Sequence, residues 1–142
     1  MRKSRHRFFR IDFTYYFFDH GRYAVEKYGD QEYFGTRVFD DKNKGAYKWQ
    51  TYKQVYDQAL AIGEALKAHG HSAHENIGLF SVNRAEWMIA ALGIYSQDMR
   101  TVALYATLGA EAVEYITTFA DITTIFVSKK SLPSIIKLLD KV

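Results

Sequence analysis

A serine, an asparagine, an arginine, a glutamate and a tryptophan lie within FSVNRAEW, residues 80–87. Asn83 and Glu86 have the spacing of a capping box, in which two side chains satisfy free backbone N–H groups at a helix start. Arg84 offers a different chemistry, because ligands bind at the carboxyl ends of parallel strands and a cation there could meet an anion. The capping box explains Asn83 and Glu86 without any ligand. We therefore predict a helix start here and keep anion binding by Arg84 as the alternative.

Three histidines, His69, His71 and His74, lie in the segment HGHSAH. Imidazole nitrogens bind zinc, so the cluster raises the question of a metal site. The segment contains no aspartate, and the chain contains no cysteine, which also excludes disulfides and thiolate ligands. Because the histidines flank Gly70, a residue type that commonly ends helices, we predict cationic side chains at a helix C-terminus and no metal site.

The segment YATLG, residues 105–109, also joins a predicted strand to a predicted helix. Gly109 would allow a tight turn and Thr107 would cap the helix. A phosphate-binding loop needs several glycines whose backbone donors converge, and neither GxGxxG nor GxxxxGKS/T occurs in the chain. No Ser/His/Asp pattern or nucleophile elbow is found either. The sequence therefore identifies no catalytic, cofactor-binding or metal-binding residue.

The positive charge of the chain is concentrated at its start, where the first ten residues carry five cations and no acid. Removing these five from the 19 Lys and Arg leaves 14 cations against 16 acids, a net charge of −2 for the other 132 residues. The body is therefore not expected to bind nucleic acid. The five cations are Arg2, Lys3, Arg5, Arg7 and Arg10.

An aromatic run, FFRIDFTYYFF at residues 8–18, follows these cations. Arg10 and Asp12 interrupt it, and it falls short of the ~20 apolar residues of a spanning helix. We predict a basic and aromatic arm, residues 1–14, followed by a helix over residues 15–28. The absence of cysteine favours an intracellular location. The alternative role of the arm is peripheral contact with the endoplasmic reticulum or another organelle membrane.

The elements that carry these segments follow from residue patterns. Residues 37–52 predict a β-hairpin with a polar turn at 40–45, and Thr51 with Gln54 forms a capping box for a helix that ends at Gly70. Three apolar strands then alternate with three helices, which predicts an α/β fold with an incomplete parallel sheet joined by right-handed crossovers. The strands are expected at 77–80, 101–105 and 122–127, and the helices at 87–95, 109–119 and 132–141.

Four segments of the chain are informative as a set: GTR at 35–37, YKWQTY at 47–52, SVNRAEW at 81–87 and LYATLGAEAVEYI at 104–116. Taken together, they resemble the N-terminal part of long-chain fatty acyl-CoA synthetases, in the adenylate-forming AMP-binding superfamily. The likeness spans about residues 28–127. It implies that residues 15–142 are a partial AMP-dependent synthetase/ligase domain, and that the complete enzyme uses ATP, Mg²⁺ and coenzyme A to convert a fatty acid to its acyl-CoA through an acyl-adenylate.

The phosphate loop, the adenine and ribose contacts and the catalytic lysine that the resemblance implies match no position in this chain. We therefore expect the isolated chain to be an inactive fragment that binds no cofactor. Ala103, Ala106 and Ala110 replace a proline, an aspartate and a proline of the family pattern. The alternative is a stand-alone truncated paralogue that acts as a membrane-surface or protein interaction module. In either case, an incomplete sheet predicts exposed apolar surface and self-association.

Overall fold

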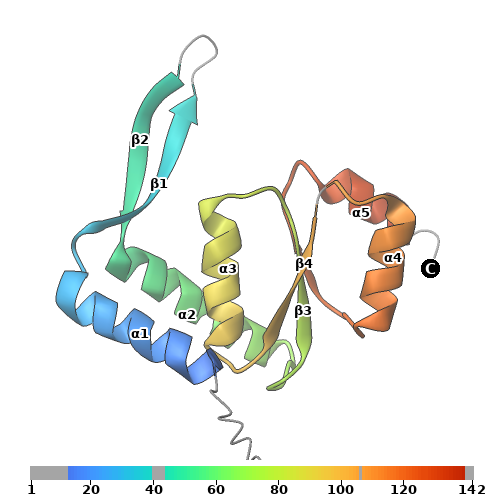
Figure 1. The fold of residues 1–142 in the computed structure, drawn as a ribbon, viewed down its shortest axis with the longest axis horizontal. Coiled ribbons are helices and arrows are strands. Elements are labelled where there is room, and N and C mark those ends of the chain that lie inside the picture. The colour runs from blue at the N-terminus through green and yellow to red at the C-terminus, as the bar shows by residue number, and fades with distance from the viewer. Residues whose placement is uncertain (1–12, 40–43, 106, 140–142) are drawn as a thin grey trace, which may run out of the picture.

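The computed structural model describes residues 13–39, 44–105 and 107–139. Most of the predicted arm, part of the predicted hairpin turn, Ala106 and the end of the last predicted helix lie outside these residues. The predicted order of a helix, a hairpin and alternating helices and strands is confirmed (Figure 1). The elements are α1 (Phe13–Tyr28), β1 (Glu32–Phe39), β2 (Lys44–Thr51), α2 (Tyr52–Ala68), β3 (Asn76–Phe80), α3 (Ala85–Tyr95), β4 (Arg100–Leu104), α4 (Ala110–Phe119), β5 (Ile125–Val127) and α5 (Leu132–Leu139).

The parallel sheet has the strand order β4-β3-β5, so β3 lies in the centre. β3 pairs along its whole length with β4, and its last three residues pair with β5. Its residues 77–80 are all buried, as expected for a strand covered on both faces. The predicted parallel sheet is therefore confirmed.

Helices cover both faces of this sheet (Figure 1). On one face, Ile77 and Leu79 of β3 pack with Leu66 of α2 and Ile94 of α3. On the other face, Phe80 packs with Leu104 of β4 and with α4 and α5 through Val113 and Ile135. The alternation of Leu79 and Phe80 between the two cores follows from the two-residue period of a strand. The buried α3, predicted from its nearly continuous apolar sequence, is confirmed.

Two glycines let α2 and α3 approach closely. A Cβ atom added to Gly93 would lie 2.7 Å from the carbonyl oxygen of Ala59 and 2.7 Å from a side-chain carbon of Ile62. A Cβ atom at Gly63 would lie 2.9 Å from the carbonyl oxygen of Gly93. All three distances are too short for real side chains, so the contact between these helices depends on the two glycines.

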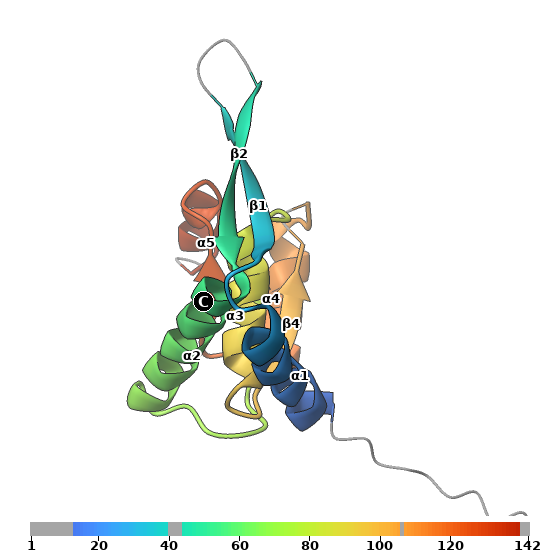
Figure 2. The same ribbon diagram turned by 90° about the vertical axis from the view of Figure 1, so that its left-hand side faces the viewer.

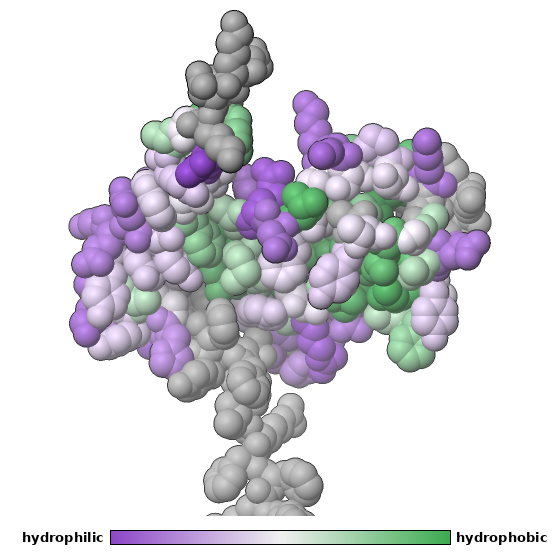
Figure 3. All heavy atoms as spheres, turned by 45° about the horizontal axis from the view of Figure 1, so that its top comes forward, coloured by the Kyte–Doolittle hydropathy of each residue, from purple (hydrophilic) through white to green (hydrophobic). Residues whose placement is uncertain are grey.

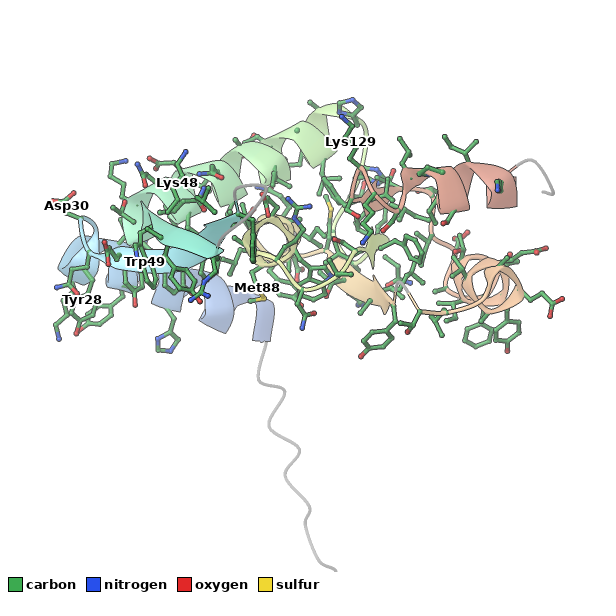
Figure 4. All side chains as sticks on the ribbon, turned by 90° about the horizontal axis from the view of Figure 1, so that it is seen from above. Tyr28, Asp30, Lys48, Trp49, Met88 and Lys129 are labelled. Atoms are coloured by element: carbon green, nitrogen blue, oxygen red, sulfur yellow. The ribbon has the colours of Figure 1, made fainter. Side chains whose placement is uncertain are left out.

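The hairpin of β1 and β2 stands away from the sheet (Figures 1 and 2). One of its faces carries Trp49, whose ring covers Gly35, and Arg37, whose guanidinium lies 4.8 Å from the ring centre of Tyr47. Neighbouring residues of a strand point to opposite faces, as Lys48 and Trp49 do in Figure 4. These long side chains therefore pack against one another within the hairpin, outside the main core.

The predicted start of α2 is confirmed, whereas the ends of two strands differ from their predictions. The capping box of Thr51 and Gln54 forms, with hydrogen bonds of 3.2 and 2.9 Å. Gly70, at φ +91°, follows the end of α2. β5 begins at residue 125 rather than 122, because the Ile122 N–H bonds to the Thr117 carbonyl and closes the end of α4. β1 begins at residue 32, five residues before the predicted hairpin.

The side of the molecule formed by α4 and α5 carries exposed apolar side chains. Tyr115 and Phe119 of α4 stack at 5.8 Å and are 67% and 79% exposed. Leu132 and Ile136 of α5 are also exposed, and Figure 3 shows apolar atoms gathered at this end. Among the described residues, no helix has the length and apolar character needed to cross a bilayer.

Candidate functional site

The carboxyl ends of the three parallel strands meet at one edge of the sheet, here called the carboxyl edge. In open α/β sheets this edge is where ligands bind. The segments that follow β3, β4 and β5 bring polar and charged side chains to it from separate parts of the sequence. These side chains are Ser81, Asn83, Arg84, Tyr105, Ser128 and Lys129.

The predicted capping box of Asn83 and Glu86 is wrong. α3 begins at Ala85, its N-cap residue is Arg84, and no side chain bonds to the helix start. Glu86 instead accepts two hydrogen bonds from Arg84, from Nε at 2.7 Å and from Nη2 at 2.9 Å. A bidentate bond to a guanidinium is stronger than a bond to a neutral backbone N–H, which explains why Glu86 points to Arg84.

This ion pair sets the electrostatics of the carboxyl edge. The hydrogen bonds from Arg84 hold the pKa of the Glu86 carboxyl below its ordinary value. Because Glu86 already neutralises Arg84, an anion that binds to Arg84 has to share or replace this carboxylate. Anion binding, the alternative role of Arg84, is therefore weakened in this arrangement.

Two cavities adjoin the pair. The first, of about 570 Å³, lies between the base of the hairpin, the start of α3 and the end of β4, and Tyr33, Phe34, Met88 and Tyr105 contribute to its walls. The second, of about 360 Å³, lies beside the end of β5 and is lined by Phe126 and Lys129, among others. Arg84 and Trp87 line both cavities. Figure 4 labels Met88 and Lys129 on either side of this region.

The apolar walls of the two cavities can accommodate an apolar group. Lys129, which lines the second cavity, can place its ammonium group beside an anionic group. Among the described residues that line the two cavities, the only carboxylate is that of Glu86, and it is held by Arg84. None of these residues is a histidine; the other polar groups of the lining include the hydroxyls of Ser81 and Ser128 and the ammonium group of Lys129.

The joint after β4 also differs from its prediction. Gly109 is the N-cap residue of α4 and has φ −66°, so Thr107 does not cap the helix and Gly109 does not use a glycine-only conformation. A Cβ atom at Gly109 would meet nothing within 4 Å. Ala106, where the family pattern has an aspartate, lies outside the described residues.

The three histidines point to different partners. His69 Nδ1 lies 2.8 Å from the Ala65 carbonyl, so this ring does lie at the C-terminal end of α2. His71 Nδ1 lies 2.7 Å from Glu75 Oε2, and its Nε2 lies 2.8 Å from Thr124 Oγ1. His74 lies 3.4 Å from Asp98. Within the part of the chain that the structure describes, no three His, Asp or Glu side chains are grouped as metal ligands would be.

Sequence reasoning missed the contribution of the hairpin to the carboxyl edge. Tyr33 and Phe34 line the same cavity as Arg84 although they lie about 50 positions earlier in the sequence. No local sequence pattern predicts this proximity. It also missed the pair of His71 and Glu75, although their four-residue separation is a spacing at which side chains commonly meet.

Comparison with protein families shows that the profile of the AMP-binding enzymes matches residues 22–142. Long chain acyl-CoA synthetase 2 of Arabidopsis thaliana is 37% identical over 126 residues, which cover 89% of this chain and 18% of that protein. Fatty acyl-CoA synthetase A of Dictyostelium discoideum is 36% identical over 117 residues, again 18% of its length. The chain thus spans less than a fifth of these relatives.

Solved structures show the same fold at lower identity. The fatty acyl CoA synthetase of Mycobacterium tuberculosis superposes with a TM-score of 0.69 and 17% identity, over 87% of this chain and 22% of that one. The fatty acid AMP ligase of Legionella pneumophila gives a TM-score of 0.68 and 18% identity, over 82% and 20%. Most of the observed fold therefore also occurs in these two solved structures.

Proposed function

Because the chain belongs to the family of AMP-binding enzymes, we propose that it serves as the N-terminal part of an ATP-dependent long-chain fatty acid–CoA ligase. The observation that carries the proposal is the 37% identity to long chain acyl-CoA synthetase 2 over 89% of the chain. In the proposed reaction, the fatty acid carboxylate attacks ATP and releases pyrophosphate. The thiol of coenzyme A then attacks the acyl-adenylate and releases AMP.

The part played by this chain in the reaction is structural. Its described residues form the helix layers, the sheet and the hairpin that border the carboxyl edge. Among these described residues, no three metal-ligating side chains are grouped together, and the sequence contains no phosphate-binding loop pattern. No step of adenylation or acyl transfer is therefore assigned to a residue of this chain.

A chimera tests the proposal. Residues 22–142 would replace the matching segment of Arabidopsis long chain acyl-CoA synthetase 2, and formation of palmitoyl-CoA would be measured with and without ATP. We expect ATP-dependent product from the chimera. The matched control carries Gly93→Phe, which forces α2 and α3 apart and should remove the activity. A soluble, cooperatively folded chimera without any activity would contradict the proposal.

The isolated chain of 142 residues is expected to be inactive. Without groups for the triphosphate, the negative charge that develops in adenylation has nothing to stabilise it. Fatty-acid-dependent exchange of labelled pyrophosphate into ATP measures the first half-reaction alone. Exchange above the buffer background, inhibited by an acyl-adenylate analogue, would show that the chain carries catalytic groups of its own.

A second candidate function concerns the arm. Five cations within ten residues, followed by aromatic side chains, favour peripheral contact with an anionic membrane. Flotation with phosphatidylserine vesicles would compare the full chain with one that lacks residues 1–14. We expect only the full chain to float with the vesicles, and equal binding by both would rule this function out.

A further inference from the structure

We propose that the segment RFFRI, residues 7–11 of the arm, folds back along α1 and fills a groove between α1 and α2. This contact within the chain goes beyond the ligase function proposed above. The groove has a volume of about 540 Å³, within the range of about 300–1,000 Å³ typical of small-molecule sites. Its lining comes from α1, the start of β1, α2 and the last turn of α3. Figure 1 shows α1 lying beside α2 and α3.

The floor of the groove is apolar and belongs to a packed core. Val55 and Ala59 of α2 are 1% and 2% exposed, and they pack with Ile89 of α3. Leu92 of α3 packs against the same cluster and lines the groove. No Lys, Arg, Asp or Glu is found among the described residues of the lining. The groove therefore accepts apolar side chains rather than charged ones.

Part of the lining is aromatic and open to solvent. Tyr23 and Tyr28 of α1 line the groove and are 58% and 36% exposed. The Tyr33 ring is stacked between Phe34 at 4.2 Å and Tyr52 at 4.1 Å, so it presents its edge to the groove. A phenylalanine ring that meets such an edge gains the edge-to-face contact that aromatic pairs favour. The segment RFFRI supplies two such rings in its phenylalanine pair.

The segment can reach the groove because it lies just before α1 in the sequence. His20, the first described residue of the lining, follows Phe13 by seven residues, or about 10 Å along the helix. Phe8 and Phe9 precede Phe13 by five and four residues, and a chain of that length spans up to about 13–18 Å. Both rings can therefore return to the level of His20. A short tether also gives a millimolar effective concentration, which favours filling by the same chain over filling by a second molecule in dilute solution.

Negative charge near Tyr56, which lines the groove, suits the two arginines of the segment. Burial raises the pKa of the Tyr56 hydroxyl; Arg22 opposes this shift, whereas the carboxylates of Asp19, Glu26 and Asp57 reinforce it. Asp19 and Asp57 pair with basic side chains, but Glu26 makes no ion pair within the described residues. The arginines that flank the phenylalanine pair can therefore stay at the rim, where Glu26 has a carboxylate available, while the rings enter the groove.

Docking in the groove withholds the segment from a membrane. The same basic and aromatic residues are those proposed for peripheral membrane contact, and they cannot occupy the groove and a bilayer surface at once. The groove is thus an internal competitor for the arm. This consequence alone rests on the proposed membrane contact, whereas the docking itself does not.

The test uses the full chain, which contains no cysteine, so that one introduced cysteine carries a nitroxide label. A label on Ser4→Cys broadens the NMR signals of methyl groups that lie close to the arm. We expect it to remove the signals of Val55 and Leu92, which line the groove. The signals of Val113 and Ile135, in the core on the other face of the sheet, should remain.

The matched control carries the same label and the same tether, with Phe8→Ser and Phe9→Ser. Its groove signals should return, because serine side chains gain nothing from the apolar floor. Gly21→Leu should also restore them, since its side chain projects beside Tyr56 into the groove. Gly21→Ala should not, because its Cβ would lie at an ordinary 3.8 Å from that ring. Circular dichroism of each variant shows that it is folded.

The proposal is overturned if the groove signals stay sharp in the labelled chain, or if they broaden equally with and without the two phenylalanines. A mixture of nitroxide-labelled chains with isotope-labelled chains that lack the nitroxide reports contacts between copies. Equal broadening in that mixture would show that the groove takes the arm of a second copy, which would overturn a contact within the chain. No ATP, fatty acid or vesicle is present, so these results leave both proposed functions untouched.

Discussion

Glu86 shows how little a well-formed ion pair contributes at an exposed position. Its side chain is 61% exposed and that of Arg84 is 45% exposed, so solvent screens the attraction between them. Exposed pairs of this kind contribute about 0–1 kcal/mol to folding stability. The pair therefore fixes the direction of two side chains at the carboxyl edge more than it stabilises the fold.

The pH dependence of this pair can be predicted from the lowered pKa of Glu86. A carboxyl whose pKa is lower in the folded state stabilises the fold above its unfolded pKa, and this contribution is lost as the pH falls through the folded pKa. Glu86→Gln should therefore lower the free energy of unfolding by less than about 1 kcal/mol at pH 7. The difference should vanish near pH 2. Urea unfolding at both pH values measures it, and an equal loss at both would refute this account.

His71 should matter more, because its side chain is only 10% exposed and both ring nitrogens are bonded. The ring connects the segment after α2 to Thr124, immediately before β5. Removing the ring leaves Thr124 without this partner, at a cost of about 1–3 kcal/mol. We expect that loss in urea unfolding of His71→Ala. His69→Ala, at an exposed position, should change stability by less than about 0.5 kcal/mol.

The two capping boxes show what residue spacing alone can predict. Thr51 and Gln54 satisfy each other's backbone N–H groups, as their separation predicts. Asn83 and Glu86 have the same separation, but the neighbouring Arg84 competes for the carboxylate and the helix begins one residue later than the box requires. Spacing identifies a candidate cap, and a nearby cation decides whether the cap forms.

Among the elements, the contact between α2 and α3 is the most sensitive to change. Gly93→Ala would bring a methyl group to 2.7 Å from the Ala59 carbonyl, although alanine favours a helix. Overpacking should outweigh the gain in helix propensity, with a loss of about 1–3 kcal/mol. Gly21→Ala in α1 is the matched control and should be neutral or stabilising by up to about 1 kcal/mol. Chemical denaturation of both variants gives the comparison, and equal stabilities would contradict it.

Element types followed from residue periodicity, whereas their ends depended on contacts between elements. β5 begins three residues later than predicted. The reason is that the Ile122 side chain is buried and its N–H bonds to the end of α4 instead of to a neighbouring strand. The role of Gly63 and Gly93 in the close approach of α2 and α3 could not be predicted from the sequence. Each lies in an apolar helix stripe where alanine would give the same pattern.

At the scale of the whole molecule, the exposed apolar face of α4 and α5 should cause self-association of the isolated chain. Large exposed apolar patches usually mark contact surfaces. Sedimentation velocity of the chain should show oligomers that dissociate in the double variant Tyr115→Ser and Phe119→Ser. The control is Tyr23→Ser, an exposed tyrosine of α1 far from this face. A monomer with a sharp melt at dilute concentration would refute the prediction.

The carboxyl edge is built from segments that lie far apart in the sequence, so it could be predicted only in part. The ends of the parallel strands and the position of Arg84 could be expected from the order of elements. The hairpin wall could not, because Tyr33 and Phe34 reach Arg84 only through the tertiary packing of β1 against α3. Binding surfaces built from distant segments require the fold before they can be recognised.

The placement of α4 and α5 on one face of the sheet also fixes the direction in which the sheet can grow. The chain passes from β4 through α4 to β5, on the far side of the central strand. A crossover through α5 on that same face keeps the right-handed sense only if it continues outward. A further parallel strand that follows α5 would therefore lie beside β5, on the side of the sheet away from β4.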